Sequence, residues 1–208
     1  MKLAGIAVAQ SLPALGLLAM GLLVASLPGH AQNAPTPAQT PAPVTDEIPN
    51  FADERTDFGV PPQATLQVLV GTTTPTSIPG GRVLTTADVV GILRAGEMPL
   101  LLVDVLDSAA HDGIPGSIWV PGAGKPGRFD DDIQRKLADT LGEVTGNDLG
   151  APLAFFCEGA RCWESYNAAL RAMRLGFQSV MWYRGGLEAW HAAGLPMAAL
   201  DPNSEHDK

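Results

Sequence analysis

The sequence predicts an α/β domain with an open, mostly parallel sheet and helices on both faces. Three short runs, at residues 100–105, 117–120 and 153–157, have the length and composition of buried strands. Segments with helical spacing of apolar residues alternate with them, at residues 131–141 and 163–173. Such alternation favours parallel pairing, because each crossover helix packs on a face of the sheet.

The remaining elements follow from their end signals. A helix begins near residue 85, with Thr85 or Thr86 as its cap and Asp88 in its first turn, and it ends before Gly96. Gly176 ends the helix at 163–173. A further strand is expected at residues 179–183 and a short closing helix at 187–193.

The N-terminal segment has the layout of a secretory signal peptide, residues 1–31. Lys2 is the only charged residue before Asp46, an apolar stretch follows it, and Gly29-His30-Ala31 resembles a cleavage site before Gln32. An uncleaved membrane anchor is the alternative, since the apolar stretch is long enough to span a bilayer. Either reading places the folded part outside the cytoplasm, and we expect a periplasmic protein.

Composition divides the rest of the chain. Residues 32–45 form a Pro/Ala linker without periodicity, which we expect to be disordered. Residues 46–81 form an N-terminal arm that we expect on the domain surface, with a short edge strand at 66–70. Residues 82–197 form the domain, and residues 198–208 form a charged tail.

The mature chain is strongly acidic. Removal of Lys2 leaves 12 basic and 22 acidic residues, a net charge of about −10. Such a surface repels nucleic acid, so no nucleic-acid partner is expected, whereas a basic partner such as a small cytochrome is compatible with it. His111 and His191 have no partners at metal-ligand spacing, and the sequence predicts no metal and no cofactor.

Cys157 is the candidate nucleophile. It ends a predicted buried strand, and a short loop to Cys162 leads into a helix. This arrangement puts Cys157 at the sheet edge where α/β proteins bind ligands, beside backbone N–H groups and a helix N-terminus that favour a thiolate. The small residues Gly159 and Ala160 let the loop curl around the sulfur, and Arg161 adds a positive charge.

Two less reactive roles are open for the cysteines. Cys157 could be a buried core residue that ends a strand. Cys157 and Cys162, which are the only cysteines in the chain, could form a disulfide in an oxidising compartment. That bond would close a very small loop and would therefore stabilise the fold only modestly.

Several segments resemble the rhodanese family. Residues 102–105, 113–118 and Pro121 are similar to its "IDV" strand and "HIPGAINIP" turn, and residues 183–196 are similar to its closing "GG…AW…AGLP". The resemblance covers roughly residues 82–196. It implies a rhodanese-like fold and a cysteine that takes sulfane sulfur from a small donor and passes it to a thiol or another nucleophile.

The resemblance also implies roles for the loop. Cys157 would carry the persulfide, and the backbone amides of Glu158, Gly159, Ala160, Arg161, Cys162 and Trp163 would bind the substrate sulfur, with Arg161 assisting anionic donors. A narrower likeness, at residues 114–121, 162–163 and 165–169, is to exported "PQQ-dependent catabolism-associated CXXCW motif" proteins. It implies a periplasmic quinoprotein dehydrogenase or its cytochrome as partner.

Two functional hypotheses remain from the sequence. The first is a sulfurtransferase, in which Cys162 is a bystander or a resolving thiol. The second is a thiol–disulfide or binding module that serves a quinoprotein dehydrogenase. A phosphatase of the same fold is excluded, because it needs an arginine two positions later than Arg161. Sulfur transfer should survive Cys162→Ser, whereas a dithiol mechanism should not.

Leu106 and Gly113 stand where rhodaneses often have arginine and histidine, and Glu158 directly follows the nucleophile. We expect Glu158 to repel a doubly charged donor such as thiosulfate, because like charges at short range oppose binding. Thiosulfate turnover should therefore be modest and should rise in Glu158→Gln. Steady-state assays of both proteins check this, and a high turnover that Glu158→Gln leaves unchanged would contradict it.

Overall fold

A five-stranded parallel sheet forms the centre of this computed structural model, which describes residues 49–68 and 71–200. The strand order is β1-β6-β5-β2-β4, and every neighbouring pair is parallel. A separate antiparallel pair joins β3 and β7. The strands are β1 (Arg82–Leu84), β2 (Leu101–Asp104), β3 (His111–Gly113), β4 (Ile118–Trp119), β5 (Leu153–Phe156), β6 (Val180–Tyr183) and β7 (Ala198–Leu200).

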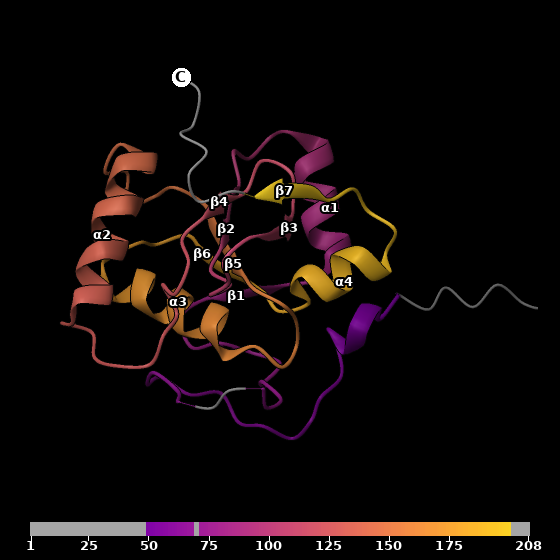
Figure 1. The fold of residues 1–208 in the computed structure, drawn as a ribbon, viewed down its shortest axis with the longest axis horizontal. Coiled ribbons are helices and arrows are strands. Elements are labelled where there is room, and N and C mark those ends of the chain that lie inside the picture. The colour runs from indigo at the N-terminus through magenta and orange to yellow at the C-terminus, as the bar shows by residue number, and fades with distance from the viewer. Residues whose placement is uncertain (1–48, 69–70, 201–208) are drawn as a thin grey trace, which may run out of the picture. The chain divides into compact units, whose positions relative to one another are not determined.

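Helices cover both faces of the sheet (Figure 1). One face packs against α2 (Asp132–Thr145) and α3 (Trp163–Arg174), and the other against α1 (Thr86–Ala95) and α4 (Gly186–Ala192). The side chains of β5 alternate between two apolar clusters, and all four are buried. This double burial explains why β5 is a continuous apolar run in the sequence. The predicted α/β class, with a mostly parallel sheet and helices on both faces, is confirmed.

The residues predicted to begin and end α1 cap it in the structure. Thr85 caps α1, and its side chain and that of Asp88 form a reciprocal capping box. Gly96 ends α1 in the left-handed conformation. Strands β2, β4, β5 and β6 and helices α2, α3 and α4 lie within a few residues of their predicted positions.

Three short strands were not predicted. β1, β3 and β7 have three residues each, too few for a period to show. β7 occupies the start of the predicted tail, where residues 198–200 pair with β3. Conversely, residues 66–68 of the predicted edge strand have no strand structure. There the backbone of Gln67 is hydrogen-bonded to the Asn167 side chain instead of to a neighbouring strand.

The arm, of which residues 49–68 and 71–81 are described, is more than the surface layer that we expected. It contains the short 3-10 helix η1 (Phe51–Asp53), and Glu54, Thr74 and Ile78 are buried. Two side chains of α3 each bind both the N–H and the carbonyl of one residue of the arm. Tyr166 Oη donates to the Gln63 carbonyl and accepts from its N–H, and Asn167 does the same for Gln67 with its amide group.

Some expectations lie outside the described residues. These are the signal peptide at 1–31, the linker at 32–45 and the tail beyond residue 200. Among the helices of the described segments, none has both the length and the hydropathy needed to cross a bilayer.

A buried arginine ties α3 to α2. Arg171 is fully buried, and its guanidinium donates to both carboxylate oxygens of Asp131 at 2.9 Å. It also donates to the Arg128 and Lys125 carbonyls and to the Gln134 side chain. Asp131 in turn caps α2. A buried charge of this kind is tolerated only while its partners are in place.

We predict that Asp131→Asn lowers the free energy of unfolding at pH 7 by about 3 kcal/mol, because it leaves a buried cation without its counter-charge. The hydrogen bond from Arg171 holds the pKa of Asp131 well below its ordinary value of 3.8. The stabilisation is therefore complete above pH 3.8 and is lost as the pH falls through the lower folded-state pKa. Urea denaturation at pH 7 and at lower pH measures both effects.

Asp130→Asn is the matched control. Asp130 pairs with Arg128 on the surface, where both side chains are mostly exposed. Its removal should change the free energy of unfolding by less than about 1 kcal/mol. Equal effects of the two substitutions would contradict the role given to Arg171.

Candidate active site

Cys157 lies where the sequence predicts it, at the carboxyl end of a central parallel strand. β5 ends at Phe156, and α3 begins at Trp163 with Cys162 as its N-terminal cap residue. Residues 157–162, here called the cysteine loop, thus join the sheet edge to the start of a helix. Cys157 is only 1% exposed, whereas Cys162 is half-buried. The two predicted features of the site, the sheet edge and the helix N-terminus, therefore lie at the two ends of one short loop that contains both cysteines.

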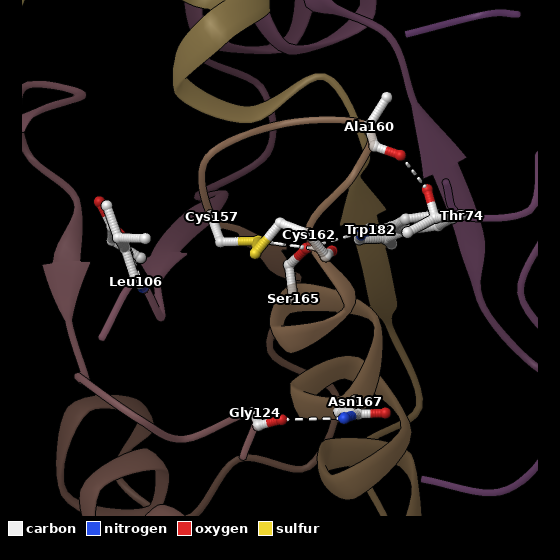
Figure 2. Close-up of a disulfide and its surroundings, with 10 residues drawn as sticks. Thr74, Leu106, Gly124, Cys157, Ala160, Cys162, Ser165, Asn167 and Trp182 are labelled. Atoms are coloured by element: carbon white, nitrogen blue, oxygen red, sulfur yellow. Dashed lines mark hydrogen bonds between the residues drawn. A yellow bond between two sulfur atoms is a disulfide. The ribbon is translucent and has the colours of Figure 1, made fainter. Parts of the chain in front are cut away.

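The two cysteines form a disulfide (Figure 2). Their Cα atoms are 6.4 Å apart, within the ordinary range for such a bond. This was one of the arrangements that the sequence left open. In this oxidised form Cys157 has no free thiol, and Cys162 is the more accessible of the two residues.

Four consecutive carbonyl groups of the cysteine loop accept hydrogen bonds. The Cys157 and Glu158 carbonyls accept from the Leu187 and Glu188 N–H groups in the first turn of α4. The Gly159 carbonyl accepts from the Cys162 N–H, and the Ala160 carbonyl accepts from both the N–H and the hydroxyl of Thr74. These bonds fix the curl of the loop from three sides.

Glycines make this approach possible. Gly186 at the start of α4 has a φ of 54°, and a Cβ there would overlap the Cys157 carbonyl oxygen. Gly159 faces the Glu188 side chain, and a Cβ there would overlap that carboxylate. Gly186 of the predicted closing motif and Gly159 of the cysteine loop thus let α4 dock on the loop.

Most N–H groups of the cysteine loop, unlike its carbonyl groups, have no hydrogen-bond partner in the described part of the chain. Those of Glu158, Gly159, Ala160 and Arg161 donate no hydrogen bond to any other residue in the described part of the chain. Because the carbonyls are engaged elsewhere, these four donors and the N-terminus of α3 are free to bind an anionic sulfur. The sequence predicts an amide cradle at residues 158–163, but the Cys162 N–H within it is already bonded to the Gly159 carbonyl and is not available.

Ser165 is a polar neighbour of Cys157 that sequence reasoning missed. Its Oγ lies 3.1 Å from the Cys157 Sγ and accepts a hydrogen bond of 3.0 Å from Trp182 Nε1 (Figure 2). Its own proton is therefore directed at the sulfur or at the Cys162 carbonyl, which is 3.4 Å away. In the reduced protein this hydroxyl can donate to a Cys157 thiolate. Only its position three residues after Cys162, in the first turn of a helix, could have indicated it.

The opposite wall of the site is apolar. Leu106, which follows β2, packs in the same apolar cluster as Cys157, on the side away from α3 (Figure 2). Its N–H is held by the Asp104 carboxylate, and its carbonyl accepts from Trp119 Nε1. Asp104 is the last residue of β2. It is buried, also contacts His111, and burial raises its pKa.

Arg161 and Trp163 have partners on the arm. The Arg161 guanidinium lies 3.8 Å from the Asp53 carboxylate and 5.2 Å from the centre of the Phe58 ring. Trp163 is buried, and its indole N–H donates to Thr72. The charge of Arg161 is thus partly neutralised by a carboxylate, and Trp163 anchors the arm.

Buried Arg184 is a further residue near the site that the sequence did not indicate. It donates to Thr74, which in turn holds the Ala160 carbonyl.

Carboxylates surround the cysteine loop. Glu158 and Glu188 are both exposed. The pKa of Glu188 is raised, first by its partial desolvation and second by the negative charge of Glu158.

A surface cavity of about 440 Å³ lies away from the cysteine loop, between the arm and the segment before α2, with Leu66, Phe129 and Arg174 in its lining. Within the described residues, no cluster of side chains has the composition of a metal site.

Fold and site together define an α/β domain with a cysteine loop between a central parallel strand and a helix N-terminus. The sequence model of the rhodanese-like domain matches residues 85–193, which is more than half of the chain. The chain therefore belongs to the rhodanese-like domain family.

Solved structures of low identity resemble the chain. A full-length protein from Lactobacillus plantarum is 20% identical with a TM-score of 0.44, over 57% of this chain and 88% of that one. A rhodanese-like domain from Anabaena sp. is 19% identical with a TM-score of 0.42, over 60% and 84%. Thiosulfate sulfurtransferase from Pseudomonas aeruginosa is 21% identical with a TM-score of 0.41, over 57% and 20%. No curated protein matches the chain.

We predict that Ser165→Ala slows alkylation of Cys157 about tenfold at pH 7, because a hydrogen bond to a charged group contributes about 1.5 kcal/mol. Both proteins carry Cys162→Ser so that Cys157 is the only thiol. The rate of reaction with iodoacetamide, followed by mass spectrometry, measures the effect.

Ser117→Ala in the same background is the control. Ser117 is a buried serine whose hydroxyl has no partner among the described residues, and none of the contacts of the cysteine loop involves it. Its removal should leave the alkylation rate unchanged. Equal rates for Ser165→Ala and Ser117→Ala would show that the Ser165 hydroxyl does not support the thiolate.

Proposed function

We propose that this protein is a sulfurtransferase that carries sulfane sulfur as a persulfide on Cys157. The observation that carries the proposal is the surroundings of the Cys157 sulfur. The loop that follows β5 has four N–H groups without a partner in the described part of the chain, it leads into the N-terminus of α3, and the Ser165 hydroxyl lies beside the sulfur. This is a site for an anionic sulfur, and membership of the rhodanese-like family supports the same chemistry at the level of the family.

The reaction begins from the reduced protein. The Cys157 thiolate attacks the outer sulfur of a donor, the bond between that sulfur and the donor breaks, and the donor leaves with the electron pair. With thiosulfate the leaving group is sulfite, and Cys157 retains a persulfide anion. A nucleophile then attacks the outer sulfur and Cys157 leaves as a thiolate, so that cyanide becomes thiocyanate. The loop N–H groups and Ser165 stabilise the negative charge on sulfur throughout.

The charges near the site favour a donor with little negative charge. Leu106 offers an aliphatic wall and no cation, and the Asp53 carboxylate partly neutralises the charge of Arg161. Glu158 and Glu188 add negative charge at the rim of the loop. A dianion such as thiosulfate is repelled by these groups. We therefore assign a neutral or singly charged persulfide as the preferred donor, and a small thiol as the acceptor.

We propose a periplasmic location and a partner in quinoprotein metabolism. The signal-peptide layout of residues 1–31 supports export. The likeness to exported CXXCW-motif proteins supports a periplasmic quinoprotein dehydrogenase or its cytochrome as partner. The net charge of about −10 after removal of residues 1–31 suits a basic cytochrome.

The disulfide favours a second candidate function. A protein in which Cys157 and Cys162 remain oxidised, or exchange electrons without accepting sulfur, would be a thiol–disulfide or binding module. Its reaction would depend on both cysteines equally. The two candidates therefore differ in whether Cys157 accepts a sulfur atom.

Intact mass of Cys162→Ser protein purified from the periplasm tests the proposal. We expect a chain that begins at Gln32 and gains one sulfur atom on treatment with thiosulfate or glutathione persulfide, faster with the latter. Subsequent cyanide should remove that atom as thiocyanate.

Cys157→Ser is the control and should gain nothing. A Cys162→Ser protein that never accepts sulfur from either donor would overturn the proposal and leave the redox module. A chain that retains residues 1–31 would instead indicate the membrane anchor.

A further inference from the structure

Cys162 is positioned to act on the sulfur that Cys157 carries. We propose that Cys162 is a resolving thiol, which attacks the Cys157 persulfide, releases hydrosulfide and leaves the disulfide present in this structure. This inference rests on the proposed persulfide chemistry. It adds a second reaction, reductive release of sulfide, for which the reductant is the protein's own second thiol.

The geometry places the attacking atom within bonding reach. The disulfide shows that Cys162 Sγ reaches Cys157 Sγ while the cysteine loop keeps all four of its carbonyl hydrogen bonds. No rearrangement of β5 or α3 is needed, since Cys157 directly follows β5 and Cys162 directly precedes α3 in the same arrangement. A simple persulfide carrier needs no second cysteine at this position.

The anchoring of the loop keeps the two sulfurs together after reduction. α4 holds the carbonyls at the Cys157 end, and Thr74 and the Cys162 N–H hold those at the Cys162 end. Thr74 is itself fixed by buried Arg184. Two reacting groups held in this way react as though at a very high local concentration, so Cys162 competes with dissolved acceptors.

The step balances in atoms and electrons. The Cys162 thiolate attacks Cys157 Sγ, the bond from Cys157 Sγ to the outer sulfur breaks, and that sulfur leaves as hydrosulfide with the electron pair. The persulfide and the thiol together become one disulfide and one hydrogen sulfide. The outer sulfur is reduced by two electrons, and the two cysteine sulfurs are oxidised by two.

Exposure indicates how the dithiol is restored. Cys162 is half-buried and Cys157 is only 1% exposed, so an external thiolate reaches the Cys162 sulfur first. Its attack expels Cys157, the thiolate that Ser165 and the loop N–H groups stabilise as a leaving group. A second thiol, from the same dithiol protein or another small molecule, then frees Cys162 and leaves as a disulfide with the first.

Single-turnover chemistry tests the proposal. Fully reduced protein, freed of reductant under anaerobic conditions, is treated with thiosulfate, which supplies no thiol. We expect the wild type to release one hydrosulfide per chain and to lose two hydrogens in mass. Cys162→Ser and Cys162→Ala should instead gain one sulfur atom and release no sulfide. Trapping with monobromobimane quantifies the sulfide, and intact mass follows the protein.

The outcomes separate this inference from the proposed function. A wild type that keeps a stable extra sulfur while Cys162→Ser also gains one would overturn the resolving role but not the sulfurtransferase. A loss of two hydrogens without sulfide would also overturn it, because the disulfide would then form by another oxidant. Failure of the Cys162 variants to gain sulfur from thiosulfate and from glutathione persulfide alike would overturn the sulfurtransferase itself.

Discussion

Four successive carbonyl groups, from Cys157 to Ala160, accept hydrogen bonds, three of them from α4 and Thr74 and one from the Cys162 N–H. In a peptide group the N–H points opposite to the carbonyl, so these bonds fix the shape of the loop and also orient the N–H groups on which the proposed anion site depends. The same bonds hold Cys157 and Cys162 side by side. The proposed sulfur binding and the disulfide thus depend on the same backbone constraint.

The constraint depends on a segment outside the family's usual domain. The matched region begins at residue 85, yet Thr74 binds the Ala160 carbonyl, and Thr72 and Asp53 contact Trp163 and Arg161. Hydrogen bonds from Arg184 and α3 attach this arm to the domain. The arm is therefore a structural part of the site rather than a tether, and a chain cut at the start of the matched region would lack it.

Sequence patterns predicted most of the longer helices and strands of this protein, but not its contacts between distant residues. The buried run of β5, the capping box of α1 and the position of Cys157 were all predicted, because each depends on a few neighbouring residues. The three-residue strands β1, β3 and β7 were missed, because so short a segment has no period. Ser165 was missed as well, since its role exists only once α3 starts beside β5.

By itself, the sequence determined the α/β class and the position of Cys157 after a buried strand, because hydrophobic periodicity and end signals are local properties of the chain. The tertiary structure decided everything that depends on distance between remote residues. It brought Thr74 and α4 to the cysteine loop, paired Arg161 with Asp53, and left Cys157 buried beneath a more accessible Cys162. Spacing along the chain left the state of the two cysteines open. Only the folded arrangement, which fixes both Cα positions, brings their sulfurs into one bond.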